Sequence, residues 1–426
     1  MRNLYRRCLH NFDGACCVSF FLFGEKKKLR IDRKTIEKED KKMLIGCTKN
    51  LLEFLKESPA EREEAIDPLF SWTANLIMLN RRKTLVAVND ATKCCFILHG
   101  LTTKMIPKIP ELLKNGIRAV LESEYISPDV IEKYLNDCGQ NLVFTTTLRS
   151  EVAYCNKACE RVKSFSEILI QGDLLQKPFL PWFNDDLLSK YSYRTITEIL
   201  ISTFSERYGS PVQSTQMVEL EVELDLHMPC KRTLLVPTNL NFYQLHRILQ
   251  IAFGWEDRHL HQFILKKDHS GRPTKIIQPI DEEAEVFLDM SIKNIESTEI
   301  TIGEVFALHK KIEYEYDFGD SWMHTIKLKK WIENCENPYP KCLDAIGESP
   351  VEDCGGCFCF EEKMEILADP AHPYYQKIMA WSGGKCTKPM DLKWINCHIA
   401  DVYRRCVPPL CSGYCYLNFY DNHTLN

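Results

Sequence analysis

The chain has 426 residues, of which 45% are hydrophobic and 27% are charged, a composition that excludes a generally disordered protein. Its length predicts two or three domains. The 54 Lys and Arg residues are outnumbered by 59 Asp and Glu residues, so the formal net charge is -5. This balance argues against a nucleic-acid footprint over the whole chain, which needs a basic excess, and leaves a local basic patch open.

The 20 cysteines are frequent but stay below the ~8–10% that marks a disulfide scaffold. We therefore expect mostly free thiols and a cytoplasmic protein. The longest apolar run, residues 15–24, is too short for a membrane span of ~20 residues. Lysines follow it instead of a small-residue cleavage site, so we expect neither a membrane anchor nor a signal peptide.

Residues 1–42 form an atypical N-terminal extension, since they include a charged run with little apolar periodicity. A cleaner pattern begins at Met43, which is also a candidate for the true first residue. From residue 43 to 160 the pattern predicts an uncharacterised domain with helices and short buried strands. The helices are expected at 49–56 and 110–122, and the strands at 84–88 and 95–98.

Residues 161–216 are predicted to be a partly helical connector, with helices at 165–170 and 193–204. Its last part, 208–216, combines Gly, Pro and Ser and is the best linker in the chain. Residues 385–426 are a cysteine-rich tail of uncertain structure.

Residues 217–384 are predicted to be a second domain, whose clearest strand, 218–226, alternates apolar and acidic residues. Because strands and helices do not alternate as regular βαβ units, we expect an α+β fold with two small domains, antiparallel sheets and flanking helices. The other elements expected in this domain are a helix at 241–253 capped by Gly254, a hairpin of strands 312–317 and 322–328, and helices at 361–368 and 373–381.

Several motifs occur in order between residues 217 and 383. They are RTLLVP at 232–237, LH at 245–246, AFGW at 252–255, HLHQF at 259–263, YEYDFGDSWMH at 314–324, PVEDCGG at 350–356 and ADPAHP at 368–373. Together they make this segment similar to the plasmid pRiA4b ORF-3-like family. The resemblance implies a bacterial protein carried by plasmids and transposons, and it implies no established reaction.

The segment from Met43 to about Cys159 resembles a second bacterial family, a domain of unknown function. This resemblance implies a domain boundary and no chemistry. It is carried by CTK at 47–49, Trp72, ANLI at 74–77, RRK at 81–83, NDAT at 89–92, Arg149, Ser150 and Asn156.

The strongest candidate site lies in the second domain. His259 and His261 are two residues apart, so on a strand both imidazoles would face one way. Imidazoles and carboxylates that converge there could bind Zn²⁺ or Mn²⁺ and activate a water molecule. The alternative is structural: the aspartates cap a tight turn, and the histidines are hydrogen-bonded core members. The full candidate set is His259, His261, Tyr316, Asp317, Asp320, Trp322, His324, Asp353, Asp369 and His372.

A second candidate is a zinc site at Cys342, Cys354, Cys357 and Cys359. Cys354 and Cys357 form a C-x-x-C pair, a spacing at which two thiolates can share one Zn²⁺. No second such pair accompanies it, so free thiols beside a glycine turn are the alternative.

In the first domain, the basic run 81–83 and Arg149 could contact phosphate, with a solvated loop as the alternative. Residues 89–92 are expected to form a turn.

No phosphate-binding loop, dinucleotide-binding fingerprint or nucleophile elbow occurs in a supporting context. We therefore expect a plasmid- or transposon-associated accessory protein that acts as a binding or interaction module. Tyr314, Tyr316, Trp322, His259 and His261 are expected to line its cleft. The alternative is a metal-dependent hydrolase that uses the His/Asp cluster, with phosphodiesters as the candidate substrate class. A protein or a nucleic acid of a mobile element is the expected partner, and Zn is the candidate cofactor.

Overall fold

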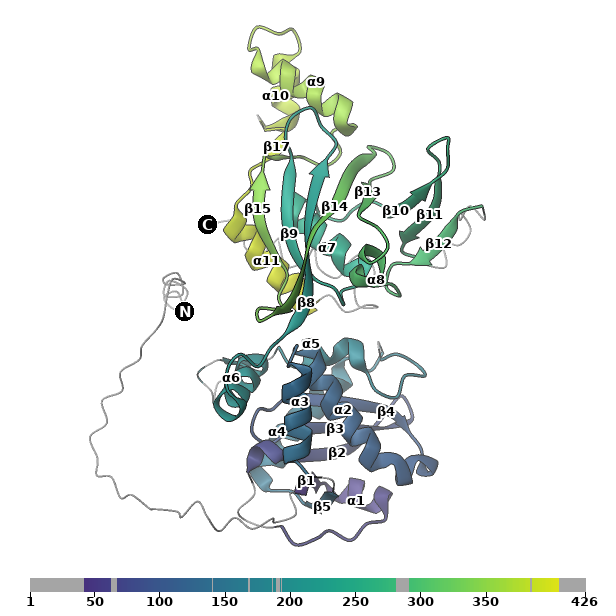
Figure 1. The fold of residues 1–426 in the computed structure, drawn as a ribbon, viewed down its shortest axis with the longest axis vertical. Helices are drawn as coiled ribbons and strands as arrows, with labels where there is room; N and C mark the ends of the chain where they lie inside the picture. Colours follow the sequence, from purple (N-terminus) through teal and green to yellow (C-terminus); the bar gives the residue numbers. More distant parts are fainter. Residues whose placement is uncertain are drawn as a thin grey trace, which may run out of the picture. The chain divides into compact units, whose positions relative to one another are not determined.

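The computed structural model describes residues 42–405, apart from 63–66, 140, 168, 186, 189–191, 193, 281–290 and 384. The predicted extension up to residue 41 and the predicted tail from residue 406 lie outside the described residues. The buried hydrophobic residues divide into cores up to Val212 and a core from Val218 onward. Each of the two parts has its own large sheet (Figure 1).

The first part is built on a five-stranded sheet of order β4-β3-β2-β1-β5. Strands β2, β3 and β4 form an antiparallel meander, whereas β1 is parallel to both β2 and β5. The parallel pairs make this sheet mixed, because the chain crosses over after β1 before it enters β2. The strands are β1 Lys42–Cys47, β2 Ser71–Leu79, β3 Arg82–Asn89, β4 Cys95–Leu101 and β5 Asn141–Thr146.

Helices cover both faces of this sheet. Successive side chains of β3 alternate between the two cores, with Leu85 and Ala87 in one and Val86 and Val88 in the other. The α-helices are α1 Lys49–Leu55, α2 Ile109–Ser123, α3 Pro128–Asp137, α4 Arg149–Ser164, α5 Leu180–Phe183 and α6 Ile196–Tyr208; short elements are η1 Pro68–Phe70, η2 Thr103–Lys108, η3 Lys177–Phe179, β6 Leu187–Leu188 and β7 Arg194–Thr195.

The helices predicted at 49–56, 110–122 and 193–204 correspond to α1, α2 and α6. The helix predicted at 165–170 is wrong: α4 ends at Ser164 and the described residues after it form turns. The apolar residues there do not mark one face of a helix, because Leu169 is buried in the core as a member of a turn segment.

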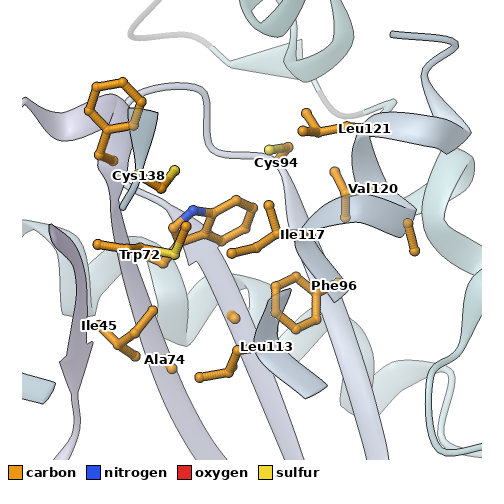
Figure 2. Close-up of a cluster of buried hydrophobic side chains, with 14 of the residues drawn as sticks. Ile45, Trp72, Ala74, Cys94, Phe96, Leu113, Ile117, Val120, Leu121 and Cys138 are labelled. Carbon is orange, nitrogen blue, oxygen red and sulfur yellow. The ribbon is translucent and has the colours of Figure 1, made fainter. Parts of the chain in front are cut away.

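The centre of the first part is a contact between two aromatic residues on different strands, Trp72 on β2 and Phe96 on β4. The Trp72 and Phe96 rings lie 5.5 Å apart, and Figure 2 shows them beside Ile117 from α2. A Cβ atom on Gly116 would lie only 2.3 Å from the Phe96 ring. The absence of a side chain at Gly116 therefore lets α2 approach the sheet.

The second part has an eight-stranded sheet of order β12-β11-β10-β13-β14-β8-β9-β15. Its strand pairs are antiparallel except for β11 and β12, which largely agrees with the predicted antiparallel sheet. Strand β8 shows the predicted alternation of buried and half-buried residues. The strands are β8 Thr215–Leu224, β9 Lys231–Pro237, β10 His261–Lys267, β11 Pro273–Gln278, β12 Lys293–Glu296, β13 Lys311–Tyr316, β14 Trp322–Cys335 and β15 Lys341–Ile346.

Helix α7 (Phe242–Phe253) starts with a capping box at Asn241 and ends at Gly254, whose φ is 72°. Helix α11 (Leu392–Arg405) places Ile395 and Ile399 in the same core, although the sequence left this segment in the tail. No described helix has the length and apolar character needed to cross a membrane. The remaining elements are α8 Ile302–Phe306, α9 Gly356–Ala368, α10 Tyr375–Ser382, β16 Ser349–Pro350 and β17 Thr387–Lys388.

Replacing Gly116 by Val tests the close approach of α2. We expect Gly116→Val to lower the free energy of unfolding by about 1–3 kcal/mol, because overpacking forces the helix or the Phe96 ring to move. Denaturant unfolding measures the change. Asn115→Val, at the exposed neighbouring position of the same helix, is the control and should lower the free energy of unfolding by less. Equal stability of wild type and Gly116→Val would contradict the packing argument.

Candidate metal centre

Three segments of the second part bring a histidine and two aspartates together. His259 lies between α7 and β10, Asp317 begins the turn between β13 and β14, and Asp353 precedes α9. One possible ligand atom from each lies within 4.8 Å of the other two. His259 Nε2 is 3.6 Å from Asp317 Oδ2 and 3.0 Å from Asp353 Oδ1. The sequence nominated all three residues.

The Asp317 backbone makes this convergence possible. Asp317 has a φ of 59°, and its Oδ1 accepts hydrogen bonds from the N–H groups of Gly319 and Asp320, at 2.9 and 3.3 Å. Its own N–H donates to Leu260 O at 2.9 Å, which ties the turn to the segment that carries His259. One carboxylate oxygen therefore caps the turn, and the other faces the imidazole.

The segment that carries Asp353 is held by hydrogen bonds to the neighbouring residue, Glu352. Glu352 Oε1 accepts the Tyr316 hydroxyl proton at 2.5 Å, and Glu352 Oε2 accepts the Glu256 N–H at 3.0 Å. Burial raises the pKa of Glu352. The Asp353 side chain itself is 62% exposed, whereas those of His259 and Asp317 are 28% and 11% exposed. The cluster thus reaches the protein surface through Asp353.

The separations fit a bound cation. Two ligands of a tetrahedral Zn²⁺ at bond lengths of ~2.0–2.1 Å lie about 3.3 Å apart. The two measured separations, 3.0 and 3.6 Å, bracket that value. A donor set of one imidazole and two carboxylates suits Zn²⁺ or Mn²⁺. His259 Nε2 is buried and lacks a partner in hydrogen-bond geometry, so no hydrogen bond occupies this atom.

A second cluster of potential ligands, His246, Asp257 and His261, has a different geometry. His246 Nε2 and Asp257 Oδ1 are 2.6 Å apart, a hydrogen-bond distance, and Asp257 Oδ2 pairs with Arg247. The His246 and His261 rings are stacked at 3.4 Å with an angle of 3° between them. Lone pairs in parallel ring planes do not converge on one ion. The arrangement therefore favours hydrogen bonding over metal binding.

His246 uses both ring nitrogens for hydrogen bonds. Nδ1 lies 2.8 Å from the Tyr314 hydroxyl, which also accepts a hydrogen bond from Gln250 Nε2 at 3.0 Å. Nε2 donates to the Asp257 carboxylate. Burial alone would raise the pKa of Asp257, but His246 and Arg247 outweigh it and hold the pKa below its usual value.

The expected cleft is not formed by the aromatic residues. Tyr314, Tyr316 and Trp322 are almost completely buried, so they belong to the core and cannot line an open surface. Trp255 stacks on Tyr316 at a centroid distance of 5.0 Å and lies 6.1 Å from Trp322. His324 points into the same core, where its ring meets Trp255 edge-on. The structural alternative foreseen for the histidines therefore describes His324.

His261 likewise lies apart from His259, although the two are close in sequence. His261 begins β10 and is buried, whereas His259 lies in the bend before that strand. Asp320 does not join the metal ligands; its Oδ2 accepts the Gly355 N–H at 3.0 Å. Asp369 and His372 make local hydrogen bonds between α9 and α10, to the N–H groups of Ala371 and Tyr374.

The four candidate zinc cysteines do not assemble in the described part of the chain. No three of them bring their sulfur atoms within the 4.8 Å that defines the two clusters above. Cys342 and Cys354 are buried, Cys359 is half-buried and Cys357 is exposed. Burial raises the pKa of the Cys342 thiol to about 11 and that of Cys354 to about 12.

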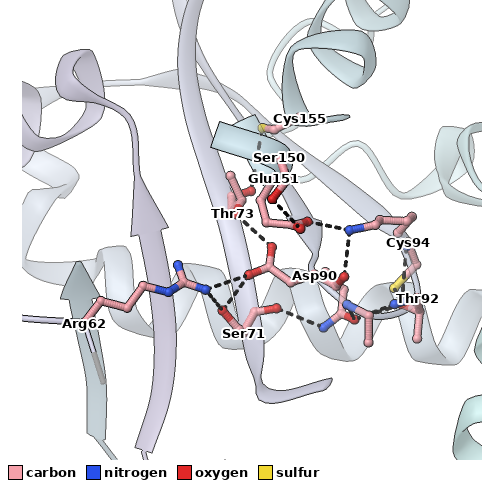
Figure 3. Close-up of polar contacts among 12 residues, drawn as sticks. Arg62, Ser71, Thr73, Asp90, Thr92, Cys94, Ser150, Glu151 and Cys155 are labelled. Carbon is pink, nitrogen blue, oxygen red and sulfur yellow. Dashed lines mark hydrogen bonds and ion pairs between the residues drawn. The ribbon is translucent and has the colours of Figure 1, made fainter. Parts of the chain in front are cut away.

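In the first part, residues 89–92 form the expected turn. Asn89 Oδ1 accepts the N–H groups of Ala91 and Thr92. Asp90 accepts protons from the Ser71 and Thr73 hydroxyls at 2.6 and 2.7 Å (Figure 3). The network continues through an Arg62–Asp90 ion pair and a Lys93–Glu151 ion pair. Since both Asp90 oxygens and the Lys93 ammonium have partners, this network is structural.

Sequence reasoning missed His246, Asp257 and Glu352. His246 occupies a buried position of an apolar helix face, where a histidine gives no signal of its own. The usable signal was the motifs: His246 lies in LH at 245–246, Glu352 lies in PVEDCGG at 350–356, and Asp257 follows Gly254 and Trp255.

His324 gives a testable pH dependence. Its Nδ1–H donates to Trp322 O at 3.0 Å, while Nε2 is buried without a partner. Burial lowers the pKa of His324 from 6.5 to about 3. The unfolded chain therefore binds more protons between these values, so stability is full above pH 6.5 and falls as the pH drops toward 3.

Denaturant unfolding between pH 7.5 and 4 should show this loss, at up to about 1.4 kcal/mol per pH unit for each such histidine. His324→Phe should have a flatter profile, because the phenyl ring keeps the packing and cannot be protonated. His269→Phe, at an exposed position, is the control and should keep the wild-type slope. An unchanged slope in His324→Phe would contradict the assignment.

Comparisons with known proteins agree with both resemblances. Residues 216–398 match the family described as plasmid pRiA4b ORF-3-like protein, and residues 44–195 match a domain of unknown function (DUF6933). The uncharacterized protein y4hQ of Sinorhizobium fredii is 34% identical over 169 residues, which are 39% of this chain and 81% of y4hQ.

Among solved structures, the protein of unknown function MM3350 from Methanosarcina mazei is 26% identical, with a TM-score of 0.36; the match covers 42% of this chain and 96% of that one. The identity to y4hQ and the match to the family model are sufficient to classify the chain. It belongs to the plasmid pRiA4b ORF-3-like family through its second part, and carries the domain of unknown function in its first.

Proposed function

We propose that this protein is a binding module that uses a divalent cation held by His259, Asp317 and Asp353. The observation that supports it is the convergence of these three side chains, with His259 Nε2 at 3.0 and 3.6 Å from the two carboxylates. Three protein ligands leave further coordination positions open. An oxygen atom of a ligand takes such a position, so the cation links the protein to its ligand.

We further propose that the protein acts in the bacterial cytoplasm as an accessory protein of a plasmid or transposon. Cys47, Cys94 and Cys230 are buried free thiols, in keeping with a reducing compartment. The family name supplies the link to plasmids. A protein or nucleic acid of the mobile element remains the expected partner, and Zn²⁺ and Mn²⁺ are the candidate ions.

Isothermal titration calorimetry of the full chain with Mn²⁺ tests the cation site. We expect about one equivalent to bind, and His259→Ala and Asp353→Asn each to weaken binding at least tenfold, about 1.4 kcal/mol, because each removes a ligand. Asp369→Asn serves as a matched control and should bind like wild type, since Asp369 bonds only within its own loop. Wild-type affinity in His259→Ala would refute the site.

A metal-dependent hydrolase is the second candidate. It is favoured by the three-ligand set, since a cation with open positions lowers the pKa of a bound water and generates a nucleophile. The donor residues are the same, so the two candidates differ in chemistry and not in location.

Incubating the Mn²⁺-loaded chain with bis(p-nitrophenyl) phosphate separates the two candidates. The binding-module proposal predicts no release of nitrophenolate above the Mn²⁺-only control. The hydrolase candidate predicts release that His259→Ala abolishes. Release that persists in His259→Ala would point to a contaminant and would leave the binding module as the better account.

A further inference from the structure

The segment that carries Asp353 is attached to the rest of the domain on both sides of that residue. On the N-terminal side, the Tyr316 hydroxyl and the Glu256 N–H hold the Glu352 carboxylate. On the C-terminal side, the Asp320 carboxylate accepts the Gly355 N–H at 3.0 Å. Asp353 thus lies between two fixed points, although its own side chain is the most exposed of the three ligands.

The backbone on the C-terminal side fits closely against the hairpin turn. Gly355 and Gly356 have φ values of 89° and 77°, which disfavour any residue with a Cβ atom. A Cβ atom on Gly356 would lie 2.4 Å from Asp320 O. The turn that presents Asp317 therefore also receives the segment that presents Asp353, and Asp320 is the residue through which they meet.

We infer that Asp320 is a positioning residue of the cation site, which holds the third ligand, Asp353, within reach of His259 and Asp317. This inference rests on the proposed function. The sequence placed Asp320 among the ligands, whereas the geometry assigns it to the support of another ligand. Groups that orient metal ligands in this way contribute ~10–100-fold to metal affinity.

A backbone N–H needs an acceptor and not a negative charge. Asp320→Asn keeps an acceptor oxygen at this position, whereas Asp320→Ala removes it. If Asp320 were a ligand or acted through its charge, both variants would lose the cation. If Asp320 positions the Asp353 segment, only Asp320→Ala should lose the cation.

The experiment measures Co²⁺ binding to the full chain by titration and by visible absorption, which reports the coordination geometry. We expect Asp320→Ala to weaken binding by tenfold or more and to give a spectrum like that of Asp353→Asn, because both lose the third ligand. The affinity of Asp320→Asn for Co²⁺ should stay within about threefold of the wild-type affinity, and its spectrum should match that of wild type, because this variant keeps an acceptor oxygen.

Asp268→Ala is the matched control, since Asp268 also caps a turn, between β10 and β11, by accepting N–H groups of Ser270 and Arg272. It should bind Co²⁺ like wild type. Tyr316→Phe removes only a hydroxyl on the other side of Asp353 and provides a second variant in case Asp320→Ala does not fold; it too should weaken binding and shift the spectrum.

Three results would overturn the inference: wild-type binding in both Asp320→Ala and Tyr316→Phe, equal losses in Asp320→Asn and Asp320→Ala, or a wild-type spectrum in every weakened variant. A wild-type chain that binds no Co²⁺ would refute the proposed function itself, and with it this inference. The two failures are therefore distinguishable.

Discussion

The candidate centre depends on the hydrogen bond from the Asp317 N–H to Leu260 O, 2.9 Å long. It extends the antiparallel pairing of β10 with β13, in which His261 lies opposite Tyr316, and so joins the hairpin turn to the segment of His259. Asp317 also caps its own turn with one carboxylate oxygen, which leaves the other directed at His259. A single residue therefore shapes the turn and contributes to the ligand set.

The different roles of the histidines follow from how deeply each one is buried. His261 and His324 are kept neutral, since burial lowers both pKa values, and they belong to the interior. His259 is half-buried at a junction of loops. At this junction the imidazole meets two carboxylates, whereas the stacked rings of His246 and His261 do not converge on one point.

The sequence predicted the local elements of the second domain well. The alternation in β8, the capped helix α7 and the β13–β14 hairpin each follow from a periodicity or a turn signal within a short window. The parallel pairing of β1 with β2 and β5 was not predicted, because it depends on residues that are far apart in the sequence. Helix α4 was missed because its surface is largely polar.

The candidate site shows the same limit. Histidine and aspartate spacing nominated His259, Asp317 and Asp353, but it also nominated His324 and Asp320, because spacing does not distinguish a surface junction from a core or a ligand from its support. His246 was part of a family motif but was not nominated for the site, since it lies on an apolar helix face. Its role follows only from the hydrogen bonds that it makes with Tyr314 and Asp257.

Anomalous scattering from crystals of the full chain grown with Zn²⁺, recorded at the zinc absorption edge, tests the central claim most directly. The account predicts one strong peak within bonding distance of His259 Nε2, Asp317 Oδ2 and Asp353 Oδ1. A peak between His246 and His261, a peak at the cysteines 342, 354, 357 and 359, or no peak at saturating Zn²⁺ would contradict it.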